Sequence, residues 1–323
     1  IENSNFSAFN SVAQPAIAIH HTDMRLYPTS DEIFYDPRRT GEGFPFDYNQ
    51  NSSVHINTPL FISHYSKDGE WAYIKTAFAF GWLPMHDIAL VTPQFQEAFQ
   101  NGKYAMTITD NLYLSENGEH LSLVKMGSLF PTDYQKRYYL FAGKDEKGFA
   151  YIKHFRANAM NLISKKPIKF NQHNIGFISK QLVGEPYGWG GKLQARDCSA
   201  LTRDFFAPFG VYLPRNSRQQ ALESMGEYIS LAGLSEEERR RTILSNAKPF
   251  RSLLYVPGHV TLYLGEKNGE PIILHNYWGV RLKSGNKHIM GRAIISTTRP
   301  GVERSDVKRP SMLSNTLKGV VNF

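Results

Sequence analysis

The sequence predicts an α+β protein in which two small β-barrels precede a domain built of helices and a sheet. Short strand-like segments between turns fill residues 17–91, and a second series of the same kind runs over residues 103–155. From residue 174 onward, segments with helical periodicity are followed by alternating segments typical of strands. These patterns, in this order, indicate β-rich units in front of an α+β core.

Length and composition fit a folded protein of two or three domains. The chain has 323 residues, 41% of them hydrophobic, and no apolar run approaches the roughly 18 residues of a membrane span. A net charge of +8 would suit an anionic polymer such as a cell-wall layer, but equally an ordinary basic surface. No basic helix or RNA-binding signature indicates a nucleic-acid partner. One cysteine excludes an intramolecular disulfide, and a signal peptide is expected to be absent from this chain.

A short internal sequence repeat supports the prediction of two barrels. The sequence Trp-Ala-Tyr-Ile-Lys at 71–75 returns as Phe-Ala-Tyr-Ile-Lys at 149–153, each after a turn of Lys, Asp and Gly. Likewise Arg-Leu-Tyr at 25–27 returns as Asn-Leu-Tyr at 111–113. We therefore expect an irregular N-terminal segment and two barrels, the first containing a long loop at 27–53. The expected bounds are 1–16, 17–95 and 102–158.

The third region, residues 161–299, is expected to form the α+β domain. Asn174 could cap a helix that Gly184 and Pro186 end. Ser235 and Glu238 form a capping box for another helix, whose charged run is most simply a solvated face. The remaining residues, 300–323, are expected to be a basic tail, either packed on another domain or loose.

The chain's one cysteine follows a glycine-rich aromatic turn. This turn, Tyr187-Gly-Trp-Gly-Gly191, contains glycines that allow backbone angles closed to other residues. Asp197 is a suitable N-cap, and apolar residues at 201, 205 and 209 then form one helical stripe. Cys198 would lie in the first helical turn, where the dipole favours a thiolate. A lone cysteine is usually a small buried hydrophobe, but this position indicates a nucleophile.

Two alternating segments around the turn-rich residues 265–269 predict a β-hairpin that carries two histidines. If Leu264 pairs with Glu270 across a five-residue loop, His259 directly faces His275. One imidazole could then act as the base for the thiol while the other orients it. A lone strand histidine is more often structural, and a bulge would change this register.

Other catalytic constellations find no support in the sequence. The motif His-Glu-x-x-His is absent, and the adjacent His20 and His21 point to opposite faces of a strand, so no zinc site is expected there. Neither a Gly-x-Ser-x-Gly elbow nor a phosphate-binding loop is present. The sequence therefore predicts no metal and no cofactor.

The motifs around the cysteine and the histidines resemble the NlpC/P60 family of cell-wall cysteine peptidases. The resemblance covers about residues 161–299, and it implies a papain-like core with a triad of Cys198, His259 and His275. Many members have a Gly-Asp-Leu strand signal where this chain has Leu-Leu-Tyr-Val-Pro at 253–257. The resemblance rests on five segments in the family's order: 187–191, 197–199, 213–217, 257–265 and 274–279.

The two N-terminal units resemble bacterial SH3-like domains. Phe44-Pro-Phe-Asp-Tyr48, together with Trp71 and Gly81-Trp82, is similar to the first SH3-like domain that accompanies some of these enzymes. The predicted fold is therefore a papain-like catalytic domain preceded by two SH3-like barrels.

The resemblance implies roles for residues beside the triad. Tyr187 corresponds to the family tyrosine whose hydroxyl, with the Cys198 amide, can serve an oxyanion. Three of the polar residues that would bind substrate also have ordinary explanations: Asp197 as a helix cap, Ser199 as a first-turn polar residue and Arg215 as a surface charge. The implied groove residues are Asp197, Ser199, Arg215 and Ser217, with Trp189 as one wall.

The activity implied by the resemblance is hydrolysis of the γ-D-glutamyl bond to the diamino acid in peptidoglycan stem peptides. In members with a leading SH3-like domain, that domain closes one end of the groove and the substrate's free N-terminal amine is held there. Asp197 is the matching carboxylate, and Asp87 of the first barrel is a second candidate. The expected location is the cell envelope, with a cytoplasmic recycling role as an alternative. A wall-binding protein without activity, and an amidase or acyltransferase acting on another substrate, stay open.

Overall fold

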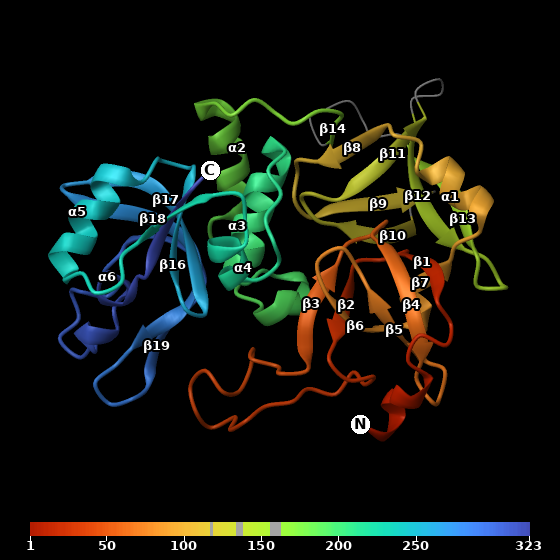
Figure 1. Ribbon diagram of the computed structural model, residues 1–323, viewed down its shortest axis with the longest axis horizontal. Helices are drawn as coiled ribbons and strands as arrows, with labels where there is room; N and C mark the ends of the chain where they lie inside the picture. Colours follow the sequence, from red (N-terminus) through yellow and green to blue (C-terminus); the bar gives the residue numbers. More distant parts are fainter. Residues whose placement is uncertain (117–118, 134–137, 156–162) are drawn as a thin grey trace.

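The computed structural model describes residues 1–116, 119–133, 138–155 and 163–323. Figure 1 shows two β-rich units on one side, a sheet on the other, and three helices between them. These helices are α2 (Gln172–Leu182), α3 (Cys198–Phe206) and α4 (Ser217–Leu222). Within the described residues, no helix is long and apolar enough to cross a membrane.

The first barrel is a seven-stranded sheet in the order β3-β2-β6-β5-β4-β1-β7. The segment expected to be irregular, residues 1–16, runs into β1 and lies on the barrel, where the Ser4 carbonyl is 3.0 Å from His64 Nε2. The loop expected at 27–53 is present up to the start of β3. The strands are β1 (Gln14–Ala18), β2 (Thr22–Arg25), β3 (Gln50–Val54), β4 (Pro59–Tyr65), β5 (Trp71–Lys75), β6 (Phe80–Pro84) and β7 (Ile88–Leu90).

The second β-rich unit pairs β13-β12-β11-β8-β14 in one sheet and β10-β9 in another. The helix α1 (Pro93–Phe99) joins it to the first barrel, because Phe95 and Phe99 pack among apolar residues of both. The echoed sequences form β5 and much of β13. The expected boundary between 158 and 161 lies outside the described residues. The strands are β8 (Tyr104–Thr107), β9 (Leu112–Glu116), β10 (Glu119–Val124), β11 (Leu129–Asp133), β12 (Tyr138–Lys144), β13 (Ala150–Phe155) and β14 (Ile163–Ser164).

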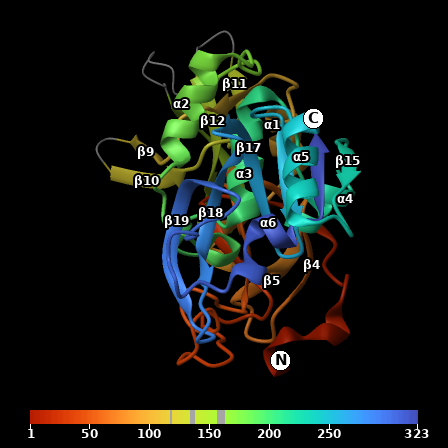
Figure 2. The ribbon, with the colours of Figure 1, turned by 90° about the vertical axis from the view of Figure 1, so that its left-hand side faces the viewer.

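The third body is a six-stranded antiparallel sheet in the order β15-β20-β16-β17-β18-β19. Successive residues of a strand point to opposite faces of the sheet, and helices cover both faces. Thus Leu253 and Leu274 pack with α2, α3 and α4, while Leu254 and Ile273 pack with α5 and α6. In Figure 2 the helix α5 lies over the outer side of the sheet. The elements are β15 (Glu227–Ser230), α5 (Glu236–Asn246), β16 (Ser252–Val256), β17 (His259–Lys267), β18 (Glu270–Arg281), β19 (Lys287–Thr297), α6 (Leu313–Thr316) and β20 (Gly319–Asn322).

Two expectations about this body need correction. Residues 300–323 do not form a loose or basic tail, since β20 lies between β15 and β16 inside the sheet. The apolar run of β20 is short in the sequence, but Val320 and Val321 are fully buried on opposite faces of the sheet. The cap of α2 is Asn171, not Asn174, because the Asn171 side chain accepts the Asn174 amide.

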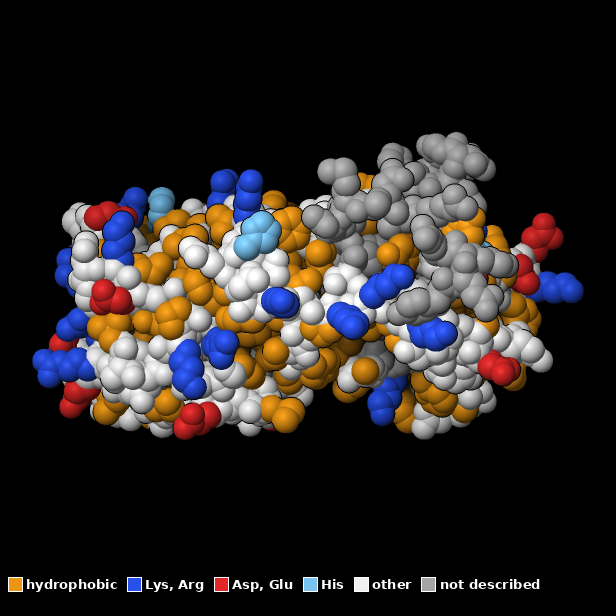
Figure 3. Space-filling model, turned by 90° about the horizontal axis from the view of Figure 1, so that it is seen from above, with side chains coloured by type: hydrophobic (Ala, Val, Ile, Leu, Met, Phe, Trp, Pro, Cys, Tyr) orange, Lys and Arg blue, Asp and Glu red, His pale blue; other side chains and the backbone are white. Residues whose placement is uncertain are grey.

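Other features agree with the sequence or complete the fold. The capping box of Ser235 and Glu238 starts α5 as predicted. On the face shown in Figure 3, the Lys and Arg side chains of the described residues are scattered, and some lie beside Asp or Glu. Short 3-10 helices occur at Glu2–Ser4, Phe6–Ala8, Met85–Asp87, Trp189–Gln194, Ala207–Phe209 and Arg309–Ser311.

Candidate active site

Cys198 is the first residue of α3, where the sequence predicted a nucleophile. Asp197 caps the helix, and its Oδ1 accepts a hydrogen bond from the Ala200 amide at 2.8 Å. The thiol is buried, and its sulfur lies within hydrogen-bonding reach of the backbone N–H of Val260. Because Val260 follows His259 in β17, this contact places the sulfur at the first predicted histidine.

Two glycines let the segment before Cys198 lie against the first barrel. Gly190 and Gly191 have φ angles of 60° and 89°, a region that favours glycine. A Cβ at Gly190 would lie 2.8 Å from Gln50 Cγ, and one at Gly191 would lie 2.5 Å from Ser53 Oγ. The glycine turn therefore serves a close approach between β3 and the nucleophile segment.

The two histidines contact each other, but the predicted register is wrong. The hairpin turns through Asn268 and Gly269, and a bulge near Gly265 makes Leu262 pair with Leu274, not with Ile272. His259 and His275 are therefore diagonal neighbours, not directly opposed ones. Since the offset is two residues, both side chains stay on one face of the sheet, as their contact requires.

The contact between the imidazoles is close. His259 Nε2 lies 2.9 Å from His275 Nδ1, and the ring centroids are 5.2 Å apart. Tyr277 packs on both rings, at 5.3 Å from His259 and 4.7 Å from His275. On its far side, His275 Nε2 lies 3.1 Å from Ser296 Oγ of β19. From the sequence, Ser296 was assigned no role.

Burial favours the neutral form of the thiol and of both imidazoles. Burial, together with the nearby Asp197 carboxylate, raises the pKa of Cys198 to about 12. Burial lowers the pKa of His259 to about 4 and that of His275 well below its usual value. Lost hydration therefore opposes the thiolate that the helix-start position favours. The arrangement suits a general base that takes the thiol proton during attack.

Arg215 is a buried organiser of the site and not a surface charge. Its guanidinium donates to Asp197 Oδ2 at 2.7 Å and to Asp197 Oδ1 at 3.1 Å. It also donates to Ser199 Oγ at 3.0 Å and to Ser52 Oγ of the first barrel at 2.8 Å. Burial alone would raise the pKa of Asp197, but Arg215 holds this pKa below its usual value. Three predicted groove residues are thus brought together, and Ser52 joins them.

The long loop of the first barrel contributes an aromatic wall. Phe46 lies 5.7 Å from Tyr187 and 5.3 Å from Trp189, between ring centroids. It also meets Trp278 edge-on at 5.3 Å, and Tyr187 lies 5.7 Å from Trp278. Burial, and the proximity of Cys198, raise the pKa of Tyr187 well above its usual value, so its hydroxyl stays protonated and can donate. Phe46 belongs to the motif that suggested an SH3-like domain, but its packing on the nucleophile segment was not foreseen.

Ser217 lies in α4 and Asp87 in the first barrel. Ser217 is half-buried as the first residue of α4, whose cap is Asn216. Asp87 accepts a hydrogen bond from Thr22 within the first barrel. It lines a cavity of about 720 Å³ that includes Asp23 and Lys192 but none of the predicted triad.

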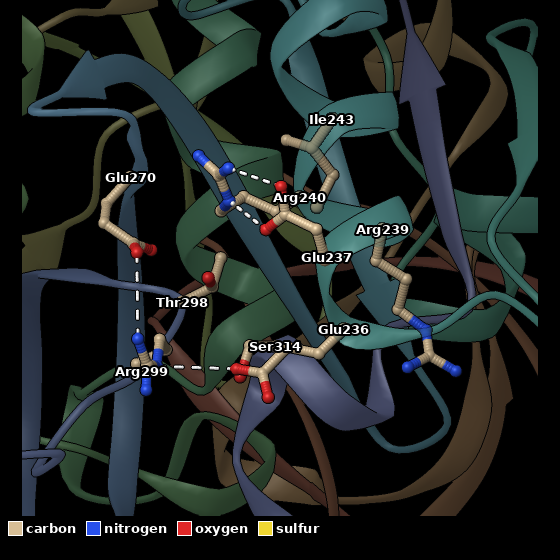
Figure 4. Close-up of a pocket in the computed structure, with 9 residues that line it drawn as sticks. All are labelled: Glu236, Glu237, Arg239, Arg240, Ile243, Glu270, Thr298, Arg299 and Ser314. Atoms are coloured by element: carbon tan, nitrogen blue, oxygen red, sulfur yellow. Dashed lines mark hydrogen bonds and ion pairs between the residues drawn. The ribbon is translucent and has the colours of Figure 1, made fainter.

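A second, smaller cavity of about 260 Å³ lies on the outer side of the sheet (Figure 4). Among its charged side chains, Arg240 is bound to Glu237, and Arg299 lies near Glu236 and Glu270. None of the predicted site residues lines it. Among the described residues, no group of three or more His, Cys, Asp and Glu side chains is placed to hold a metal ion.

Comparisons with known proteins agree with the geometry. Residues 32–84 match the SH3 domain (SH3b1 type), and residues 184–299 match the NlpC/P60 family. A comparison with curated proteins found no match. An NlpC/P60 endopeptidase from Photobacterium damselae subsp. piscicida has a similar structure, with a TM-score of 0.88 and 26% identity, over 100% of this chain and 76% of that one.

A more distant structure shares the fold. An NlpC/P60 family protein from Bacillus cereus ATCC 10987 has a TM-score of 0.58 and 13% identity, over 94% of this chain and 98% of that one. The motif matches and the structural likeness cover both the barrels and the α+β domain. Residues 184–299 are therefore an NlpC/P60 domain, and they follow an SH3-like, β-rich N-terminal region.

Proposed function

We propose that the protein hydrolyses the γ-D-glutamyl bond to the diamino acid in peptidoglycan stem peptides, with Cys198 as nucleophile. The observation that carries the proposal is the buried thiol at the start of α3, beside the contacting pair of His259 and His275. A wall-binding protein without activity would have no need of this arrangement. Peptidoglycan as substrate places the protein in the cell envelope or in the recycling of released peptides.

The reaction uses the neutral thiol and imidazole. As the Cys198 sulfur attacks the γ-carbonyl carbon, its proton passes to His259, and the oxyanion accepts hydrogen bonds from Tyr187 and the Cys198 amide. The tetrahedral intermediate collapses to a thioester, and His259 gives the proton to the leaving amine. A water molecule, deprotonated by His259, then hydrolyses the thioester and restores the thiol.

We further propose that the substrate carries a free N-terminal L-Ala. The aromatic wall formed by Phe46 with Tyr187, Trp189 and Trp278 supports a groove closed at one end by the first barrel. Asp197 is the better-supported holder of the amine, because it adjoins the nucleophile, while Asp87 lines a separate cavity. A carboxylate and an ammonium form a charge-assisted hydrogen bond, about twice as strong as a neutral one.

The experiment compares two synthetic substrates, L-Ala-γ-D-Glu-diamino acid and its N-acetylated twin. We expect products cut after the second residue, weighed by mass spectrometry, and kcat/KM at least about 10-fold higher for the free amine, as the loss of one charged hydrogen bond predicts. Equal rates on both substrates would remove the free-amine proposal and leave the peptidase intact. Cleavage of neither substrate by folded protein would overturn the proposed bond.

A further inference from the structure

The histidine pair belongs to a longer chain of hydrogen bonds that ends at a backbone carbonyl. His259 Nε2 and His275 Nδ1 are 2.9 Å apart, and His275 Nε2 and Ser296 Oγ are 3.1 Å apart. Ser296 Oγ in turn donates to the carbonyl oxygen of Thr297 at 2.8 Å. The chain therefore runs through two imidazoles and a hydroxyl, and its last group has no proton to give.

This last group fixes the direction of every proton in the chain. A carbonyl oxygen only accepts, so the single hydroxyl proton of Ser296 lies on the Thr297 side. Ser296 Oγ must then accept from His275, which places the His275 proton on Nε2. His275 Nδ1 is left as an acceptor and takes the proton of His259 Nε2. Each neutral imidazole carries one ring proton, so His259 Nδ1 has none.

We propose that Ser296 is a positioning residue that selects the tautomers of both histidines and so presents His259 Nδ1 as the free base for the thiol. The inference rests on the proposed role of His259 as general base. With the opposite polarity, His259 would carry its proton on Nδ1, and the only nitrogen left to accept the thiol proton would face His275.

The chain also stabilises the imidazolium that forms during attack, and it does so without a charged group. When His259 takes the thiol proton, its Nε2–H still donates to His275, whose Nε2–H donates to Ser296. Each acceptor atom turned toward the cation carries partial negative charge, so the aligned dipoles favour the charged ring. Ser296 therefore acts on the reaction at a distance, through His275.

The test compares Ser296→Ala, Ser296→Thr and Ile295→Ala with the wild type. Without the hydroxyl, the His275 N–H loses its acceptor, and we expect kcat to fall roughly 10- to 100-fold with little change in KM. Ser296→Thr keeps an Oγ and should restore kcat to within about 3-fold. Ile295 is 53% exposed and points to the opposite face of β19, so Ile295→Ala should behave as wild type.

A second measurement needs no substrate. Nitrogen-15 NMR of wild-type protein at neutral pH should show both histidines protonated at Nε2 and bare at Nδ1, with a mixture of tautomers in Ser296→Ala. A wild-type His259 protonated at Nδ1 would overturn the proposal, whether or not stem peptides are the substrate. Unchanged kcat in Ser296→Ala, or a threonine variant as slow as the alanine one, would also overturn it.

Discussion

Arg196 and Asp110 form a two-pronged ion pair between the nucleophile segment and the second β-rich unit, with N–O distances of 2.7 and 2.6 Å. Both side chains are almost completely buried, at 1% and 3% exposure. Lys125 of the same unit lies 3.3 Å from Asp110 and 3.1 Å from Glu185, which also binds Arg196. Because Arg196 stands two residues before Cys198, the second unit helps to hold the nucleophile in place.

Removing this carboxylate should destabilise the whole chain. Asp110→Asn leaves Arg196 with less compensating charge in a buried site, and breaking such a pair costs about 3–5 kcal/mol. Urea unfolding measures the change. The control is Asp306→Asn, which breaks an exposed pair with Arg304 and should change the free energy of unfolding far less. Equal effects of the two variants would show that the buried pair adds no special stability.

The stability that Asp110 contributes should be lost in acid. Burial raises its pKa, but Arg196 and Lys125 outweigh this and lower the pKa of Asp110 to about 2. A carboxylate whose pKa is depressed in the folded state adds stability that is present above its unfolded pKa, about 3.9, and lost as pH falls through the folded value. The difference in unfolding free energy between wild type and Asp110→Asn should therefore shrink between about pH 4 and pH 2. A difference that stays constant over this range would contradict the assignment.

Cys198→Ala should abolish turnover while the fold survives. Alanine suits a helix start, and removal of one buried sulfur should change the free energy of unfolding by about 1 kcal/mol. Thermal melting followed by circular dichroism gives the stability, and mass spectrometry of stem-peptide digests gives the activity. Cleavage near the wild-type rate would show that another group is the nucleophile.

The two histidines should act as one unit. His259→Ala removes the base and should slow kcat roughly 10²- to 10⁴-fold, at least as much as His275→Ala. The double variant should be little slower than His259→Ala alone, because losses within a catalytic unit are strongly non-additive. Steady-state kinetics of the three variants decides. Losses that simply multiply would mean that the imidazoles act independently.

The pH profile should reflect a buried imidazole and not a thiolate. Since burial lowers the pKa of His259 to about 4, the acid limb of kcat/KM should appear only as pH drops through that value. The pKa of Cys198 at about 12 predicts slow alkylation by iodoacetamide up to about pH 9. An acid limb near pH 6.5, or rapid alkylation at neutral pH, would indicate a thiolate–imidazolium pair instead.

Features set by neighbours in the chain could be predicted from the sequence. Asp197 caps α3 and Ser235 begins α5 because a cap needs only a side chain and an amide three residues on. The contact of His259 with His275 was also predictable, because both residues lie on the same face of one predicted hairpin. Its register was not, since the bulge near Gly265 depends on how the whole sheet twists.

Features that depend on distant parts of the chain escaped sequence reasoning. Arg196 meets Asp110 across 86 residues, and Arg215 meets Ser52 across 163. Ser296 lies 21 residues from His275, and nothing in its local sequence distinguishes it from any strand serine. Burial raises the pKa of Cys198, whereas a helix-start position alone suggests a lowered one.

The place of β20 inside the sheet has a consequence for synthesis on the ribosome. Domains generally fold as they emerge, the N-terminal ones first. Both β-rich units and the segment with Cys198 leave the ribosome well before residues 319–322, which fill the gap between β15 and β16. Phe323 also packs on Phe206 of α3, at 5.4 Å between ring centroids. A nascent chain that stops short of this strand has an open sheet, so peptidase activity should arise only once these residues have been translated.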